Sequence, residues 1–155
     1  MRLYHGSEQT VEFPEIRITK FNKDFYWGFH CTQSRPQAER WAIRRGRDGV
    51  LNRYAYTPSD VLKVKQFPEM SEDWLDFIIS CRQGIAHPYD IVEGPMADDQ
   101  IFNFIQQYLD GGISREAFWA LAKFQHPTHQ ISFHTAAALS TLRFAGGEKI
   151  RRKRR

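Results

Sequence analysis

Histidine, aromatic and amide side chains recur in three short stretches that lie far apart along the chain. The stretches are residues 3–7, 24–32 and 129–135. In the last of them, Gln130, Ser132 and His134 fall on one face of a strand, because strand side chains alternate between two faces. A row of hydrogen-bonding groups suits a ligand cleft, although the solvent face of a strand has the same pattern. The three stretches are therefore candidates for parts of one binding site.

The elements that must position these stretches are short strands interleaved with helices. Apolar alternation and turn signals predict strands at residues 2–6, 28–32, 50–56, 61–67, 89–93 and 129–134. Capping residues and apolar stripes predict helices at residues 34–45, 71–83, 98–110, 114–124 and 136–142. Residues 8–23 are expected to form a loop or an edge strand, and residues after 142 to trail toward the C-terminus. Strands and helices do not alternate regularly, so the predicted fold class is α+β.

The size and composition of the chain exclude several classes of protein. Its 155 residues fit one domain, which we place at residues 1–150, followed by a basic tail at residues 151–155. No apolar run approaches the roughly 20 residues of a membrane helix, and cleavage of a signal peptide would remove the first stretch. Cys31 and Cys81 show no paired spacing, which predicts a reducing, cytoplasmic setting. The glycine-rich motifs of Rossmann and P-loop nucleotide sites are missing from the sequence.

The formal net charge of +4 reflects the C-terminal run, residues 151–155, which contributes five positive charges. Without these five, 17 of the 22 basic residues remain, against 18 acidic ones. Arg40, Arg44 and Arg47 share one face of the helix predicted at residues 34–45. Both basic segments could contact the phosphates of a nucleic acid or an acidic partner, or could simply be solvated.

A metal site is not expected, although three histidines lie close in sequence. Pro127 separates His126 from His129 and His134, which fall on a different element. No Asp, Glu or Cys stands at ligand spacing beside them. The candidate site is therefore predicted to work without a metal.

The ordered motifs resemble the three-part signature of His-type ADP-ribosyltransferases. The matching segments are Tyr4-His5-Gly6-Ser7, Gly28-Phe29-His30-x-Thr32, and the late strand with Gln130 and Ser132. Residues 90–95 and 97–99 also look like a small bacterial branch of this superfamily, associated with toxin–antitoxin and phage-defence loci. The resemblance extends from residue 3 to about residue 145. It implies split antiparallel sheets with flanking helices.

The function that this resemblance implies is NAD+-dependent mono-ADP-ribosylation, with cleavage of the nicotinamide–ribose bond. His5 would hold the nicotinamide-side ribose and amide, Phe29 or His30 would stack on the nicotinamide, and Gln130 would hold a ribose hydroxyl. The remaining residues of the implied NAD+ site are Gly6, Ser7, Gly28, Thr32 and Ser132. The acceptor would be a nucleic acid or a protein, and a cognate antitoxin would restrain the activity.

The second motif departs from the family pattern at two positions. A small residue is expected at position 26 and a tyrosine at position 30, where this chain has Tyr26 and His30. An imidazole can stack on a pyridinium ring with less area than a phenol. Tyr26 or Trp27 could therefore take over part of the stacking.

The third motif departs as well, because arginine-modifying members carry two glutamates where this chain has Gln130 and Ser132. An amide cannot accept a proton from the acceptor. Asp98 or Asp99, or alternatively Glu93, would then have to do so. Asp98 and Asp99 equally fit carboxylates that stabilise a helix N-terminus.

Two other functions fit the same residues. Water could capture the cationic ribose, which would make the protein an NAD+ glycohydrolase. Alternatively, a catalytically degenerate fold could bind nucleic acid or a partner protein through the arginine-rich helix and the tail.

Overall fold

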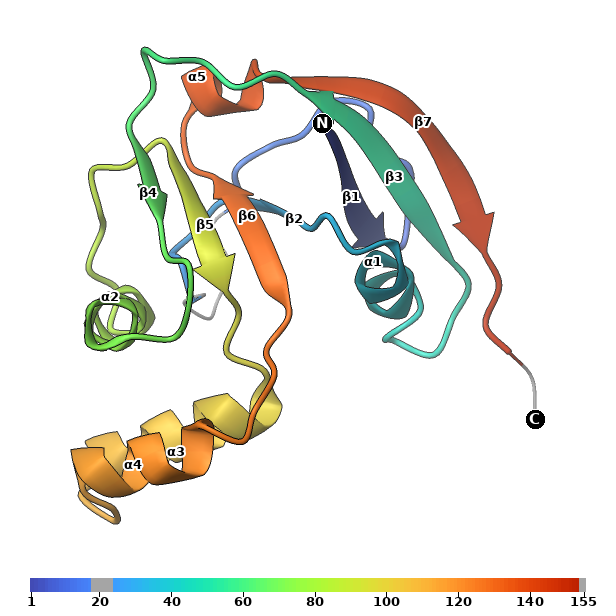
Figure 1. The fold of residues 1–155 in the computed structure, drawn as a ribbon. Helices are drawn as coiled ribbons and strands as arrows, with labels where there is room; N and C mark the ends of the chain where they lie inside the picture. The colour runs from blue at the N-terminus through green and yellow to red at the C-terminus, as the bar shows by residue number, and fades with distance from the viewer. Residues whose placement is uncertain (18–23, 154–155) are drawn as a thin grey trace.

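A computed structural model describes residues 1–17 and 24–153. Within them, two β-sheets stand side by side with helices at their flanks, so the fold is α+β as predicted (Figure 1). The first sheet has the order β1-β3-β7, formed by Arg2–Ser7, Gly49–Tyr56 and Leu142–Ile150. The second has the order β2-β6-β5-β4, formed by Phe29–Cys31, His129–Phe133, Ile91–Pro95 and Val64–Gln66.

The helices begin where the sequence predicts. They are α1 Arg35–Ala42, α2 Glu72–Arg82, α3 Asp99–Leu109, α4 Arg115–Ala122 and α5 Ala136–Leu139. The side chain before each of them, a Ser, Thr or Asp, accepts a backbone N–H of the first turn. The first helix ends earlier than predicted, at Ala42 instead of about residue 45, and the chain turns through Gly46 at a φ of 80°.

The second sheet is mixed, which corrects the expectation of antiparallel sheets. β4 pairs with β5 in parallel, with Val64 opposite Ile91, whereas β5–β6 and β2–β6 are antiparallel. The reason is the connection between these strands. α2 lies between β4 and β5 in the chain, and a helical crossover returns the second strand in the same direction as the first.

The chain after residue 142 does not trail but forms β7, the longest strand of the first sheet. Leu142–Ile150 pairs antiparallel with the whole of β3, with a register shift between Arg53 and Tyr54. The pair Gly146-Gly147 has the composition of a turn, which hides this strand in the sequence. At the shift, Gly146 has a φ of 131°, in the region that favours glycine.

The edge strand considered for residues 8–23 is not seen in its described part. Residues 8–17 form no strand, and residues 18–23 lie outside the described residues. Among the helices that the structure describes, none has both the length and the apolar character needed to cross a bilayer.

The second sheet is covered on both faces by apolar residues. On one face, Phe29 packs against Tyr54 and Phe133 packs against Tyr56, both tyrosines of the first sheet. On the other face, Val92 packs with the residues of α2, α3 and α4. Polar residues on the central strand β6 are therefore buried, which bears directly on the candidate site.

Candidate functional site

The strands that carry the three sequence motifs meet at one junction between the sheets. Tyr4 of β1 exchanges backbone hydrogen bonds with Thr32, at N–O distances of 2.8 and 2.9 Å. Cys31 of β2 lies opposite Ile131 of β6, so that the following residue, Thr32, lies beside Gln130. Because neighbouring strands are about 4.8 Å apart, β1 and β6 are separated by about 10 Å here.

His5 occupies the point where β1 and β2 diverge. Its Nδ1 lies 2.6 Å from the carbonyl oxygen of His30, and its ring centroid lies 4.2 Å from that of Phe29. Because a carbonyl only accepts hydrogen bonds, Nδ1 must carry the proton. Burial lowers the pKa of His5 below its usual value of 6.5, so the ring is neutral at pH 7. Its Nε2 then offers a lone pair that no residue in the described part of the chain uses.

Gln130 lies at the same junction but on the other face of the strands. Its side chain is 4% exposed, and within residues 1–17 and 24–153 its amide makes no hydrogen bond. Strand alternation places it with Ser132 on the face of Val92, whereas His5 lies on the face of Phe29. The two side chains thus flank the junction from opposite faces. The Gln130 amide is not among the fully buried polar groups that lack a partner, so it still reaches solvent, and water or a ligand can complete its hydrogen bonding.

The segment before β2 is held by a buried ion pair. Arg82 of α2 binds the carboxylate of Asp24, with Nε at 2.7 Å, and the second oxygen of Asp24 accepts the Ala97 N–H at 2.7 Å. Tyr26, two residues on, has a φ of 76°, in the left-handed region that favours glycine. This is the position at which the resemblance to ADP-ribosyltransferases led us to expect a small residue.

Two histidines hold the carbonyls on either side of Tyr26. His87 Nε2 lies 3.0 Å from the Phe25 carbonyl, and His134 Nδ1 lies 2.9 Å from the Trp27 carbonyl. Each nitrogen must donate, so the other nitrogen of each neutral ring accepts. His87 Nδ1 accepts the Tyr89 N–H at 3.1 Å.

The corresponding acceptor of His134 is Nε2, which lies 2.7 Å from the hydroxyl of Ser132. The ring of His134 stands nearly perpendicular to that of His87, with centroids 4.3 Å apart. Burial, with a smaller contribution from the nearby His87, lowers the pKa of His134 from 6.5 to about 4. Ser132 is fully buried, so this Ser–His pair positions the segment and cannot serve as a nucleophile and base for an outside substrate.

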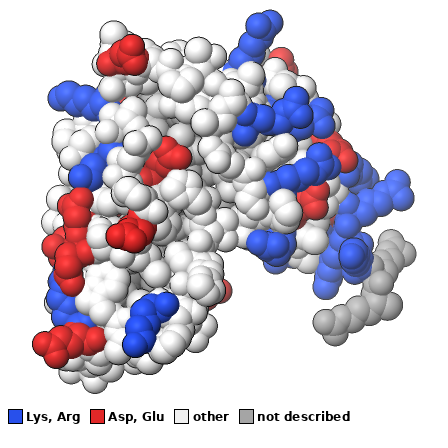
Figure 2. All heavy atoms as spheres, viewed as in Figure 1, with Lys and Arg blue, Asp and Glu red and all other residues white. Residues whose placement is uncertain are grey.

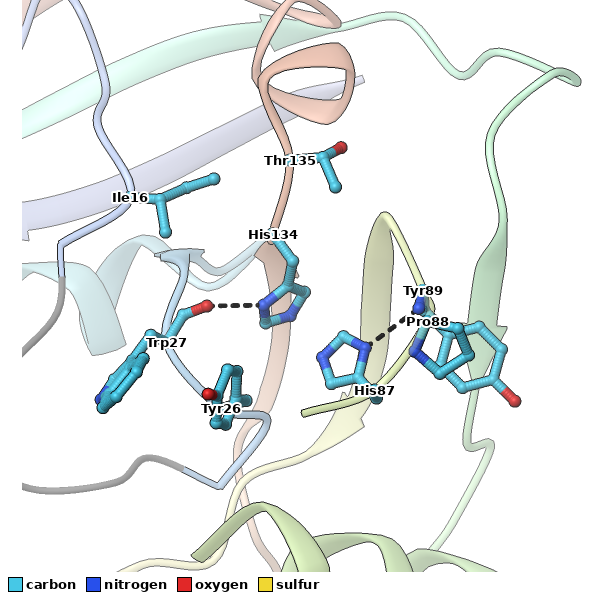
Figure 3. Close-up of a pocket in the computed structure, with 8 residues that line it drawn as sticks. All are labelled: Ile16, Tyr26, Trp27, His87, Pro88, Tyr89, His134 and Thr135. Atoms are coloured by element: carbon cyan, nitrogen blue, oxygen red, sulfur yellow. Dashed lines mark hydrogen bonds between the residues drawn. The ribbon is translucent and has the colours of Figure 1, made fainter. Parts of the chain in front are cut away.

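A cavity of about 280 Å³ opens beside these histidines (Figure 3). Aromatic rings form most of its walls: Tyr26 and Trp27 on one side, His87 and Tyr89 on the other, with His134 between them. The volume lies just below the range of about 300–1,000 Å³ typical of small-molecule sites. It can hold a ring or a sugar but not a whole dinucleotide.

Phe29 and His30, the two candidates for stacking, lie on different faces of β2. Phe29 is buried against His5 and Tyr54 in the core between the sheets. His30 lies opposite Ser132, and its ring centroid is 6.4 Å from that of His134. His30 is therefore the one of the two on the side of the aromatic cavity.

Three of the predicted NAD+-site residues have a structural role. A Cβ on Gly6 would lie 2.0 Å from the Ala38 carbonyl oxygen, so glycine lets α1 contact β1. A Cβ on Gly28 would lie 2.7 Å from His134 Nδ1. Thr32 donates from Oγ1 to the His129 carbonyl at 3.1 Å. The half-buried Ser7 lies opposite Val50 at the end of β1.

The three carboxylates considered as proton acceptors have other partners or exposed positions. Asp98 caps α3, with Oδ1 accepting the Ile101 N–H at 2.8 Å, and Asp99 is exposed in the first turn of the helix. Glu93 lies 3.1 Å from His129 Nε2, and this contact lowers the pKa of Glu93 below its usual value. A lowered pKa makes Glu93 a weaker base.

Sequence analysis did not find His87 or its pairing with His134. His134 was noted only as a member of the polar row and of a histidine group. His87 lies in the loop before β5, and no periodicity marks it. The segment His87-Pro88-Tyr89 could have indicated His87, because it places two aromatic rings beside a proline in a short loop.

Comparisons with known proteins yield one match. A family model described as "Protein of unknown function (DUF3990)" matches residues 1–144. No curated protein matches the chain. No solved structure matches it either. The functional argument therefore depends on the residues of the junction and the cavity.

Proposed function

The chain belongs to the DUF3990 family of proteins of unknown function, and we propose from its site that it is an NAD+-dependent mono-ADP-ribosyltransferase. The observation that carries the proposal is the amide of Gln130, a nearly buried residue at the strand junction, which still contacts solvent and makes no hydrogen bond within the described residues. It lies two strands from His5, whose Nε2 is likewise open. The order β1, β2, β6 across the junction supports the resemblance of the three sequence motifs to this enzyme class.

The reaction needs little from the protein beyond positioning. The bond between nicotinamide and ribose breaks, and its electron pair neutralises the cationic nicotinamide ring. The ribose becomes oxocarbenium-like until an acceptor nucleophile forms the new bond and releases its proton. A hydrogen bond from a ribose hydroxyl to the Gln130 amide strengthens as this charge develops, an effect worth several kcal/mol in glycoside hydrolysis.

The aromatic cavity supports the same proposal. A nicotinamide ring fits a space of about 280 Å³ walled by Tyr26, Trp27 and His87. Stacking of this kind contributes about 0.5–1.5 kcal/mol beyond area burial. The left-handed φ of Tyr26 also supports the resemblance, because it explains why the family pattern calls for a small residue there.

The proposal also includes a cellular compartment, a partner and a proton acceptor. Cys31 and Cys81 are both buried free thiols, which fits a reducing cytoplasm. A cognate antitoxin remains part of the proposal on resemblance alone. Asp98 and Asp99 are the carboxylates left to accept the acceptor's proton, since Glu93 is paired with His129.

The test is release of nicotinamide from NAD+ by the purified protein and by a Gln130→Ala variant. Removing one hydrogen-bonding group aimed at transition-state charge costs about 10²–10³ in rate, so we expect a loss of that size. Gln130→Glu keeps the shape and an acceptor oxygen, and should retain activity. Gln100→Ala, an exposed glutamine on α3, is the matched control and should have wild-type activity.

The fate of the ADP-ribose separates the related functions. Labelled ADP-ribose found only as the free sugar nucleotide would identify an NAD+ glycohydrolase. Undiminished nicotinamide release by folded Gln130→Ala, or no release by the wild type with protein and nucleic-acid acceptors present, would refute the proposal. Thermal unfolding of each variant shows whether it is folded.

A further inference from the structure

Basic side chains gather where α1 ends and β7 finishes (Figure 2). Residues 40–53 and 148–153 together contain nine Lys or Arg against two Asp or Glu. Eight of the nine are exposed, and two of these, Arg45 and Lys149, pair with Glu8 and Asp48. We call the six exposed members without an ion pair in the described residues the basic ridge: Arg40, Arg44, Arg47, Arg151, Arg152 and Lys153.

The first tail residues are part of this ridge and not a separate extension. The backbone N–H of Arg152 donates to Asp48 Oδ1 at 2.9 Å, and its guanidinium donates to the Gly46 carbonyl at 2.7 Å. Ile150, just before it, still pairs with Gly49. The tail therefore starts beside the turn that carries Arg44 and Arg47, and two basic segments far apart in sequence form one surface.

Most charges of the ridge are not neutralised by the protein. In the described residues, Arg40, Arg44, Arg47 and Arg151 form no ion pair. Neighbouring arginines show the contrast, since Arg35 pairs with Glu39 and Glu148. Self-repulsion among free like charges is unfavourable unless a polyanion binds them.

The other half of the molecule has the opposite charge. Residues 60–120 contain eleven Asp or Glu against four Lys or Arg. A polyanion is thus attracted to one side of the protein and repelled from the other, which orients it as well as binding it.

From this surface we propose that the basic ridge binds the sugar-phosphate backbone of a nucleic acid. The position of the ridge suits an acceptor, because α1 contacts β1 at Gly6, the neighbour of His5: a Cβ on Gly6 would lie 2.7 Å from the Ala42 nitrogen. Binding itself does not require the proposed enzyme activity. The further step, that the bound nucleic acid is the ADP-ribose acceptor, rests on the proposed function.

The chemistry of the ridge favours nucleic acid over a membrane surface. None of its described neighbours in residues 40–53 and 148–153 is a large exposed apolar residue that could enter a bilayer. Trp41, next to Arg40 of the ridge in the chain, is partly exposed and belongs to neither core cluster. A tryptophan among arginines offers stacking to an unpaired base as well as contacts to phosphate.

The test measures binding of the full chain to labelled oligonucleotides by fluorescence anisotropy, without NAD+, in about 50–200 mM KCl. The probes are single-stranded RNA, single-stranded DNA and duplex DNA. The affinity should fall with salt, with a log–log slope of about −0.7 per contacted phosphate for single strands and −0.9 for duplex DNA.

The variant combines Arg44→Gln with Arg47→Gln. It should weaken single-strand binding about 25-fold at about 100 mM salt and make the slope shallower by about 1.4. The control combines Lys63→Gln with Lys123→Gln, which removes two exposed charges from the other half and should change the affinity less than about 2-fold.

Several results would overturn this inference: salt-independent binding, equal weakening by the two double variants, or tighter binding to vesicles of phosphatidylserine and phosphatidylcholine in equal parts. Nicotinamide release is measured separately, with no nucleic acid present. Salt-dependent binding without NAD+ cleavage would refute the proposed function alone. Cleavage without such binding would refute the nucleic-acid interface alone.

Discussion

Replacing His134 should make the stability of the protein less sensitive to acid. The buried ring is neutral because its Nδ1–H donates to the Trp27 carbonyl and its Nε2 accepts from Ser132. Protonation of Nε2 would reverse the second bond, with the Ser132 hydroxyl left to donate to the Val92 carbonyl at 3.3 Å, and would place a buried positive charge 4.3 Å from the ring of His87. The variant His134→Gln removes this titrating group.

The sign and size of the effect follow from the two pKa values. In the folded protein the pKa of His134 is about 4, compared with 6.5 in the unfolded chain. Between these values the unfolded state binds a proton and the folded state does not, so the free energy of unfolding falls as the pH is lowered. The full difference is about 3.4 kcal/mol, of which about 2.5 kcal/mol should appear between about pH 7.5 and about pH 4.5.

The assay is urea unfolding followed by tryptophan fluorescence at several pH values in this window. The free energy of unfolding of the wild type should fall by about 2.5 kcal/mol more than that of His134→Gln over the same range. His126→Gln, which replaces an exposed histidine, is the matched control and should keep the wild-type pH dependence. His5 and His87 also have pKa values lowered by burial, so part of the acid sensitivity should remain in every variant.

Identical pH dependence of the wild type and a folded His134→Gln variant would show that the ring is not held neutral by burial. The arrangement of the two histidines around Tyr26 would then need another explanation.

Two further predictions concern the same segment. The variant Tyr26→Gly should be more stable than Tyr26→Ala by about 1 kcal/mol. Both variants lack the tyrosine ring, but only glycine adopts the left-handed backbone at a φ of 76° without strain. Equal unfolding midpoints of the two variants in urea would contradict this. Gly28→Ala should lower the free energy of unfolding by about 1–3 kcal/mol, because its Cβ would lie 2.7 Å from both His134 Nδ1 and the Phe133 carbonyl oxygen. Gly112→Ala, whose Cβ meets nothing closer than 3.4 Å, should change it by less than about 0.5 kcal/mol in the same experiment.

Local chemistry explains the parts of the structure that could be predicted from the sequence. Ser34, Ser71 and Ser114 mark helix starts because a side-chain oxygen within reach of the next few N–H groups is enough to cap a helix. The alternation of Gln130 and Ser132 with apolar residues along β6 likewise follows from strand geometry alone. Element types and the polar row of the candidate site were accessible in this way.

The remaining features depend on which distant segments become neighbours. β7 is a strand because β3 offers it a full edge, although Gly146-Gly147 has the composition of a turn. His87 belongs to the candidate site because its loop is folded against Phe25, 62 positions away in the chain. These contacts join residues that are far apart in the sequence, so no pattern of neighbouring residues can predict them.

The sequence alone thus determined the α+β class, the helix caps and the identity of the groups at the strand junction, because each follows from residues close together in the chain. Only the tertiary structure decided that His5 and Gln130 flank the junction from opposite faces. It also decided that Tyr26 adopts a left-handed backbone and that Arg152 joins the tail to the turn after α1. The physical reason is that faces, register and strained backbone are set by packing between elements and not by the preferences of the residues themselves.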